Sequence, residues 1–254
     1  MEQFCTHIKK GIILVVLLIL CLPVMSQKPK PKKFGLADYK KFHVGYSFGL
    51  GIAGFAINPK DTYVASLTQD PLIDINLIAD FRIGKFLNIR FLPGYRAASR
   101  TVGVTGPAPQ NSSGLSTSWS IESTYLELPI LLKYSSSRVN NIAPYLIAGF
   151  SPHFDFTGKS SFVDPNSTIP GERVATRVLK PFDFLIELGT GVDFYLATTK
   201  VAAELKFSVG MLDIFYAPTN IRPADMGKFS LYSNGIDQIF SRMVILSFHV
   251  EQSK

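Results

Sequence analysis

Cysteine and charged residues are both scarce in this sequence, and each shortage excludes a class of protein. The two cysteines, Cys5 and Cys21, lie within the first 26 residues. If that segment is removed, the mature chain has no disulfide, no thiolate metal site and no cysteine nucleophile. Charged residues make up 18% of the chain, against roughly 25% in soluble globular proteins. A soluble enzyme with a charged coat is therefore not expected.

Long apolar runs are missing too, apart from one near the N-terminus, which argues against a helical membrane protein. The 20 phenylalanines and 10 tyrosines exclude a disordered chain. The formal charge of +7 suggests a nucleic-acid partner only until the charge is located. Residues 27–41 hold six lysines against the single Asp38. The nearly neutral remainder is not a nucleic-acid-binding surface, and no nucleic-acid partner is expected.

Residues 1–26 have the layout of a secretory signal peptide. Lys9 and Lys10 form a positive region, an apolar stretch follows, and Ser26 ends the segment with a small residue. The apolar stretch is shorter than the roughly 20 residues that a spanning helix needs. Cleavage after Ser26 is therefore favoured over a membrane anchor.

Residues 27–41 form a basic arm, in which proline alternating with lysine favours an extended conformation. One interpretation is a solvated linker that also interacts with anionic lipid head groups. The alternative is a periplasmic docking arm for a partner protein. The side chains that would carry such docking are Lys28, Lys30, Lys32, Lys33, Phe34, Leu36 and Tyr39.

Alternation with a period of two residues dominates the rest of the chain and predicts β-strands. Between Phe42 and Ala53, for example, every second residue is apolar and the residues between them are small or polar. Eight stretches follow this pattern: 42–53, 73–83, 87–96, 125–134, 144–151, 182–196, 201–211 and 244–251. Most are long enough to cross a bilayer, for which a strand needs roughly 9–11 residues.

A sheet in hydrocarbon must close on itself, because no water is present to satisfy a free edge. The predicted fold class is therefore all-β: an eight-stranded antiparallel up-and-down transmembrane β-barrel over residues 42–254. Its continuous apolar face is expected to meet lipid, and its mixed face is expected to line the lumen.

Connections of two lengths alternate along the chain. Long loops are expected at about 57–71, 98–118, 157–181 and 213–238, with short turns between them. This is the layout of bacterial outer-membrane barrels, so both termini are expected in the periplasm and the long loops outside the cell. Pro93 and Pro129 fall within predicted strands, where each removes a ladder donor, and bulges are expected at both positions.

Charges of both signs occur at positions that face the lumen. In a low-dielectric interior they should pair, because an unpaired buried charge costs several kcal/mol. The expected result is a structural plug of ion pairs, since an eight-stranded barrel is only wide enough for side chains to fill; a gated polar path is the alternative. The predicted network consists of Asp74, Asp80, Arg82, Arg90, Arg96, Glu127, Lys133, Asp183, Glu187, Asp193, Glu204 and Lys206.

Few residues offer catalytic or cofactor chemistry. His43 and His249 share lumen parity near the periplasmic end, and with Glu251 they are a candidate metal cluster. His153 is expected to be alone near the outer end of its strand. The Gly-x-Gly-x-x-Gly match at Gly49–Gly54 lies in a period-two run with no following helix, so it does not indicate a dinucleotide site. No cofactor and no small-molecule substrate are expected.

Two segments, Tyr125–Tyr134 and Ala143–Gly149, resemble those of the small outer-membrane β-barrels of Bacteroidetes. Within that superfamily, Phe91–Arg96 and the ending Arg242–Val250 are most similar to the PorT family. The resemblance implies a part in type IX secretion, which exports proteins with C-terminal sorting domains. It supplies no catalytic residue.

Three functions are compatible with this sequence. The first is a non-enzymatic accessory or assembly component of type IX secretion, with outer-membrane lipid and other secretion components as partners. The second is a stand-alone surface barrel for adhesion or membrane integrity. The third is a lipid-modifying barrel enzyme.

Overall fold

A computed structural model of the protein describes residues 41–60, 63–105, 116–157, 159–163, 173–196, 199–216 and 235–252. All of them belong to one compact unit, Lys33–Lys254. The expected signal peptide (1–26) and the arm up to residue 40, with every proposed docking side chain, lie outside the described residues. Within those residues no helix is both long and apolar enough to cross a membrane.

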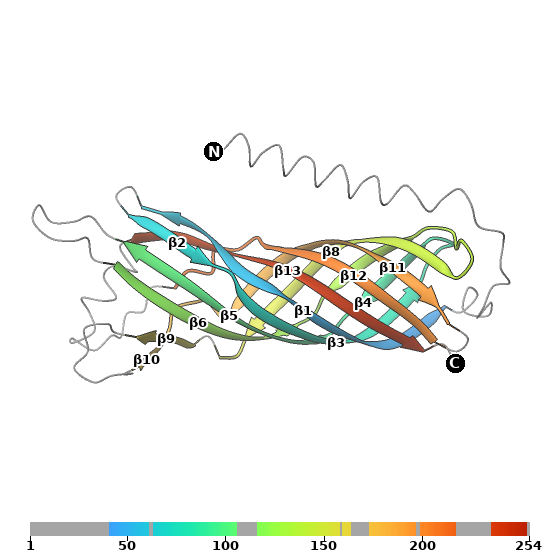
Figure 1. Ribbon diagram of the computed structural model, residues 1–254, viewed down its shortest axis with the longest axis horizontal. Coiled ribbons are helices and arrows are strands. Elements are labelled where there is room, and N and C mark those ends of the chain that lie inside the picture. The colour runs from blue at the N-terminus through green and yellow to red at the C-terminus, as the bar shows by residue number, and fades with distance from the viewer. Residues whose placement is uncertain are drawn as a thin grey trace, which may run out of the picture. The chain divides into compact units, whose positions relative to one another are not determined.

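The described residues form thirteen strands of a single antiparallel sheet (Figure 1). The strands are β1 (Phe42–Pro59), β2 (Val64–Thr68), β3 (Asp70–Arg82), β4 (Leu87–Phe91), β5 (Gly94–Thr105), β6 (Ser116–Glu127), β7 (Ile130–Ser135), β8 (Ile142–Asp155), β9 (Lys159–Val163), β10 (Arg173–Arg177), β11 (Phe182–Tyr195), β12 (Thr199–Gly210) and β13 (Ile236–Gln252).

The sheet closes because β1 pairs with β13 on one side and with β3 on the other. Around the ring, β3 pairs with both β4 and β5. β4 pairs with β7 and β5 pairs with β6, and both β6 and β7 pair with β8. Then β11, β12 and β13 follow in order. The pairs β4/β5 and β6/β7 are each one span interrupted at a proline. The ring therefore has eight spans, and the predicted eight-stranded antiparallel barrel is confirmed.

The two interruptions are not bulges, so that expectation is wrong. Across Pro93, β3 pairs Asn76 with Gly94 and Ala79 with Phe91, so the register continues without an extra residue. Each proline lacks an N–H, but its carbonyl still joins the ladder. The Leu77 N–H donates to Pro93 O at 2.9 Å, and the Leu92 N–H donates to Pro129 O at 3.1 Å. Only the missing donor breaks the strand.

The two faces of the barrel wall have the polarity that the alternation predicts. On the outer face Leu50 is 52% exposed and Leu246 is 46% exposed, whereas Asp74 and Arg90 inside are fully buried. Aromatic side chains gather near both borders of the apolar band. Phe42 packs against Phe81 at one border. At the other border Phe150 is stacked on Phe184, and Phe154 packs at a tilt against Phe182. Such girdles mark the two interfaces of an outer-membrane barrel.

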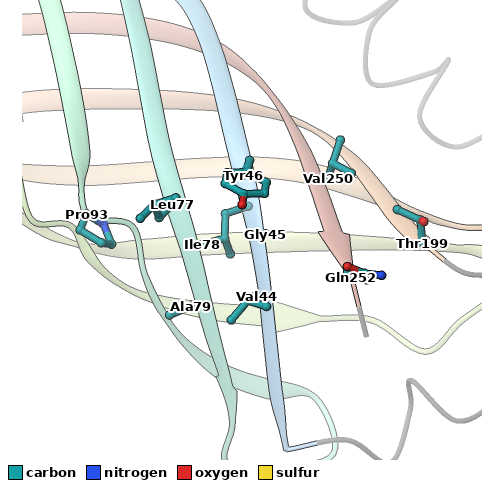
Figure 2. A pocket seen from close by; sticks show the side chains of 10 residues that line it. All are labelled: Val44, Gly45, Tyr46, Leu77, Ile78, Ala79, Pro93, Thr199, Val250 and Gln252. Carbon is teal, nitrogen blue, oxygen red and sulfur yellow. The ribbon is translucent and has the colours of Figure 1, made fainter. Parts of the chain in front are cut away.

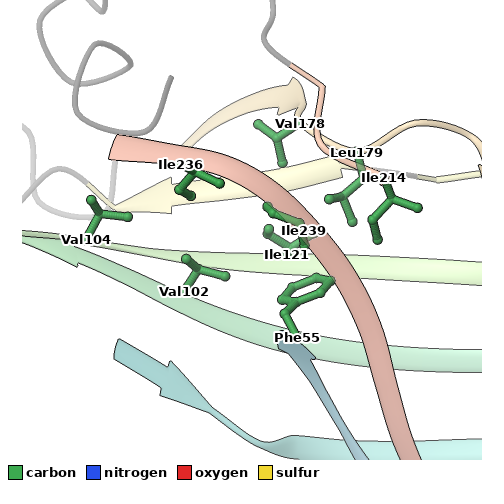
Figure 3. Packing of buried hydrophobic residues seen from close by; sticks show 9 residues of the cluster. All are labelled: Phe55, Val102, Val104, Ile121, Val178, Leu179, Ile214, Ile236 and Ile239. Atoms are coloured by element: carbon green, nitrogen blue, oxygen red, sulfur yellow. The ribbon is translucent and has the colours of Figure 1, made fainter. Parts of the chain in front are cut away.

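Beyond the apolar band, towards the end with the long connections, the polarity of the wall reverses. Figure 3 shows buried apolar side chains converging between the strands there. The cluster, here called the apolar cap, comprises Phe55, Val102, Val104, Ile121, Val178, Leu179, Ile214, Ile236 and Ile239. Polar residues such as Thr101 and Glu122 occupy the outer face at this height. Water, and not hydrocarbon, therefore surrounds this end.

Strands extend into all four predicted long loops, although β13 enters the last of them (213–238) only from Ile236. The pair β9–β10 lies within 157–181 and β2 within 57–71, while β5 continues to Thr105 and β6 begins at Ser116. The reversed polarity of the wall explains why the structure has strands where the sequence predicted loops. In Thr101–Thr105 the apolar residues face inward and the small or polar ones face outward, so a search for an apolar outer face does not detect these strands.

Candidate functional site

The interior of the barrel is filled with charged side chains, and Arg90 on β4 is the centre of one group. Its Nη2 lies 2.9 Å from Asp80 Oδ2 on β3 and 2.8 Å from Glu251 Oε1 on β13. Its Nη1 lies 3.4 Å from Glu204 Oε2 on β12. One planar guanidinium thus joins four strands across the lumen, a role that suits arginine better than lysine.

Two lysines and a tyrosine extend this group. Lys133 Nζ donates to both carboxylate oxygens of Asp193, at 2.8 and 3.0 Å, and Lys200 pairs with Glu251. The Tyr145 hydroxyl donates to Glu204 Oε2 at 2.8 Å, and Lys133 Nζ lies 3.8 Å from the centroid of the tyrosine ring. The Arg90 network comprises Asp80, Arg90, Lys133, Tyr145, Asp193, Lys200, Glu204 and Glu251.

A second group lies nearer the loop end, around Arg96 on β5. Its Nη2 lies 2.7 Å from Glu127 Oε2, 3.3 Å from Asp74 Oδ2 and 3.6 Å from Glu187 Oε1. Lys206 Nζ lies 3.2 Å from Glu187 Oε2 and 4.0 Å from Asp74 Oδ2. The Arg96 network comprises Asp74, Arg96, Glu127, His153, Glu187 and Lys206. It contains three carboxyl groups and two permanent cations.

His153 is buried within this network. The expectation that it would be alone near the outer end of its strand is therefore wrong. Its Nε2 lies 3.4 Å from Glu127 Oε2. Each of Glu127, His153 and Glu187 offers one metal-ligating atom, and these atoms lie within 4.8 Å of one another. Arg96 and Lys206 already contact the two carboxylates at 2.7 and 3.2 Å. The positive charge that a metal ion would bring is therefore largely present, and the three residues belong to the ion-pair network.

Above the two networks the interior changes from charged to aromatic and then to apolar. The fully buried Arg100 guanidinium carbon lies 4.3 Å from the Phe55 ring centroid and 5.2 Å from that of Tyr125. Its Nη1 donates to Ser241 Oγ at 3.2 Å. The apolar cap lies beyond it (Figure 3). Charged side chains, aromatic rings and aliphatic groups thus fill the lumen in succession.

The carboxylate of Asp213 anchors the segment that covers one side of the apolar cap. Its Oδ1 accepts hydrogen bonds from the N–H groups of Phe215 and Ile239, both at 3.0 Å, and its Oδ2 lies 3.2 Å from Lys180 Nζ. Partial burial acts to raise the pKa of Asp213, but these donors outweigh it and lower the pKa below its usual value.

Replacing Asp213 with alanine is expected to loosen this end at neutral pH. A carboxyl with a lowered pKa stabilises the fold above its unfolded pKa of about 3.9, and this stabilisation is lost as the pH falls through the lower folded pKa. Amide hydrogen exchange at Phe215 and Ile239 should be faster in Asp213→Ala than in the wild type at pH 7. The difference should narrow as the wild-type carboxylate is protonated; a difference independent of pH would contradict this account.

The structure brings ten of the twelve predicted network residues together. Two predictions need correction. Asp183 is buried nearer the loop end, outside both networks, and its Oδ1 accepts a hydrogen bond from the Phe184 N–H at 2.8 Å. Arg82 does not enter the lumen network. It lies at the tight turn, where its Nε and Nη2 donate to the carbonyls of Gly84 and Lys85.

The predicted metal cluster of His43, His249 and Glu251 does not form. His43 lies opposite Asp80 on β3, whereas His249 lies opposite Ser47 on β1, four residues further along that strand. At about 3.3 Å per residue this separates the two histidines by roughly 13 Å. His249 Nε2 instead lies 3.5 Å from Glu204 Oε2, and Glu251 belongs to the Arg90 network.

Sequence reasoning missed Arg100 and Lys200. Both have a readable signal, since Arg100 shares the parity of Arg96 and Lys200 shares that of Glu204 and Lys206. The predicted strands ended at residue 96 and began at residue 201, so neither residue was assigned a face.

A family model described as an outer membrane protein beta-barrel domain matches residues 25–216 of this sequence. The chain belongs to this family. As a member of it, with a closed barrel and an apolar outer band, the protein is an outer-membrane β-barrel protein of the bacterial outer membrane. No curated protein is significantly similar to the chain in sequence.

Solved structures of outer-membrane barrels are similar to this one at low sequence identity. Neisserial surface protein A is 14% identical with a TM-score of 0.39, over 82% of this chain and 96% of that one. The attachment invasion locus protein Ail of Yersinia pestis is 10% identical with a TM-score of 0.38, over 84% and 99%. The N-terminal barrel domain of Pseudomonas aeruginosa OprF is 10% identical with a TM-score of 0.31, over 81% and 96%.

Proposed function

We propose that the protein is a non-enzymatic accessory or assembly component of type IX secretion that acts through its surfaces. The observation that carries this proposal is the filled lumen. The Arg90 and Arg96 networks, Arg100 and the apolar cap occupy the interior in succession. An export substrate therefore has no route through the barrel, and partners must use its outer wall, its loops or its arm.

The assignment to type IX secretion is supported by sequence resemblance. The PorT-like segments Phe91–Arg96 and Arg242–Val250 lie on the wall of the barrel: the first spans the β4–β5 interruption and the second is most of β13. The proposed orientation has both termini in the periplasm and the long loops outside the cell. It is supported by the tight turns at the end where β13 finishes and by the long connections at the opposite end (Figure 1).

Gene deletion followed by inspection of the culture medium tests this role. Loss of secreted proteins that carry C-terminal sorting domains is the expected result. Complementation with a chain that lacks residues 28–38 then tests the docking arm. This shortened chain should still insert in the membrane, but it should no longer co-purify with secretion components. Normal secretion with altered adhesion, or altered lipid acylation, would overturn the proposal in favour of a surface barrel or a lipid-modifying enzyme.

The filled lumen also predicts that the purified barrel does not conduct ions at the level of a porin. Protein reconstituted in a planar bilayer should show no stable unitary currents, because ion pairs and apolar side chains occupy the path that water would need. A porin reconstituted in the same way provides the positive control. Reproducible open channels of porin size would contradict the structural-plug interpretation.

A further inference from the structure

Two of the grooves formed by described residues on the outer wall of the barrel differ in charge. The groove of about 630 Å³ near the tight turns is lined by Val44, Tyr46, Leu77, Ala79, Val250 and their neighbours, and it holds no charged side chain among the described residues (Figure 2). Any acyl chain fits such a surface, so it identifies no particular ligand. The groove of about 390 Å³ near the loop end contains an arginine, Arg242.

The second groove crosses the neighbouring strands β1, β13 and β12. Gly54, Arg242 and Val209 lie side by side in the ladder, and the apolar side chains of Ile52, Phe207 and Val244 line the groove on the membrane side. Gly54 keeps the groove open because it has no side chain. A Cβ at this position would lie 3.4 Å from the Cγ of Gln69, so a larger residue would fill the space.

Arg242 faces outward from the last part of the apolar band, and it differs from the cations of the lumen. Arg90, Arg96, Lys133, Lys200 and Lys206 are paired with carboxylates. The exposed Arg242 has no ion-pair partner within the described residues. An outward arginine at this border is tolerated because its long apolar stem lets the guanidinium reach the interface. There its fork suits a phosphate group.

The wall above Arg242 supplies polar groups. Asn58 on β1 and Gln238 on β13 lie four residues beyond Gly54 and Arg242 towards the loop end, and Asn58 Nδ2 donates to Gln238 Oε1 at 3.0 Å in an exposed position. Along one seam the surface therefore offers an apolar groove, then a guanidinium, and then side-chain amides. This order matches acyl chains, a phosphate and sugar hydroxyls, in that sequence.

We propose that this groove binds a phosphorylated glycolipid of the outer leaflet. The phosphate binds Arg242, one acyl chain lies along Ile52, Phe207 and Val244, and the sugar faces Asn58 and Gln238. The proposal rests on the proposed orientation, with the loop end outside the cell. It does not depend on the role in secretion, since it is tested on the purified protein.

Native mass spectrometry of the folded, full-length mature protein in a neutral detergent tests the proposal. Diphosphorylated lipid A is the probe, and phosphatidylglycerol, phosphatidylcholine and inorganic phosphate are the comparisons. We expect one lipid A per barrel and weaker binding of the other three. Arg242→Gln should lower the affinity about tenfold to hundredfold, the usual effect of losing a charged hydrogen bond.

Two more variants complete the test. Gly54→Leu retains the guanidinium but fills the groove, and it should also weaken lipid A binding. Lys180→Gln is the matched control, because Lys180 is a half-exposed cation at the same end that is already paired with Asp213. It should bind lipid A as the wild type does. Equal affinity of the wild type and Arg242→Gln, or phosphatidylglycerol binding as tightly as lipid A, would overturn the proposal.

Discussion

Replacing Arg96 with leucine is expected to cost about 3–5 kcal/mol of folding free energy, as breaking a buried ion pair usually does. The side chain contacts Glu127, Asp74 and Glu187 from the centre of the lumen. Without it, Lys206 is the only permanent cation left to three buried carboxyl groups in the Arg96 network. Urea unfolding of the barrel in lipid vesicles measures the loss, and heat-dependent migration in gels reports whether the variant has folded.

A second substitution separates the cost of the unpaired charges from the cost of the lost packing. Combining Arg96→Leu with Glu127→Gln removes one of the abandoned charges, and part of the stability should return. Arg82→Leu is the matched control, since this arginine lies at the tight turn and donates to two carbonyl groups. It should cost much less than Arg96→Leu. Equal losses for the two arginines would show that the Arg96 network does not stabilise the barrel.

Placing an arginine at Leu246 is expected to cost about 2–4 kcal/mol and to reduce the yield of folded barrel in vesicles. Leu246 lies in the middle of the outward apolar face of β13, opposite Leu50 and Leu205. An arginine on the lipid face is most costly at the midplane and nearly free at the interface. The measurement is again equilibrium unfolding from vesicles.

The control for this substitution lies on the same strand. Gln238 also faces outward, but above the apolar band, where it accepts a hydrogen bond from Asn58. Gln238→Arg should change the stability by less than 1 kcal/mol. If the two variants lost the same amount, or if Leu246→Arg had no effect, hydrocarbon would not be the medium around the apolar face.

The sequence was sufficient for the membrane-spanning part of the fold because one physical rule governs most positions there. Hydrocarbon demands an apolar residue at every second position, so Phe42 to Ile52 and Phe182 to Leu196 both reveal their faces directly. Above the band that rule no longer holds. Phe55, Val102 and Val104 are apolar but face inward. The predicted strand that begins at Phe42 therefore ended too early, at Ala53, and Val102 and Val104 were assigned to a loop.

Parity along each strand predicted which residues face the lumen, but it could not predict which of them contact one another. Parity located Arg90 and Glu251 inside, yet it cannot say that a residue of β4 meets a residue of β13 across the barrel. The stagger between strands decides such contacts, and it is not readable from alternation alone. The same stagger places His43 opposite Asp80 and away from His249, which is why the expected histidine pair does not form.

The seam between β1 and β13 determines when this protein can finish folding. It joins residues about 200 positions apart, from Val44 with Gln252 to Pro59 with Ile236. These are the strand pairings most distant in sequence among the described residues, so folding is expected to be slow. Until the last strand arrives, the edges of β1 and β12 remain open to pairing with other polypeptides. Since β13 also carries Glu251 to Arg90 and Lys200, closing the cylinder and completing the ion pairs of these two cations are a single late event.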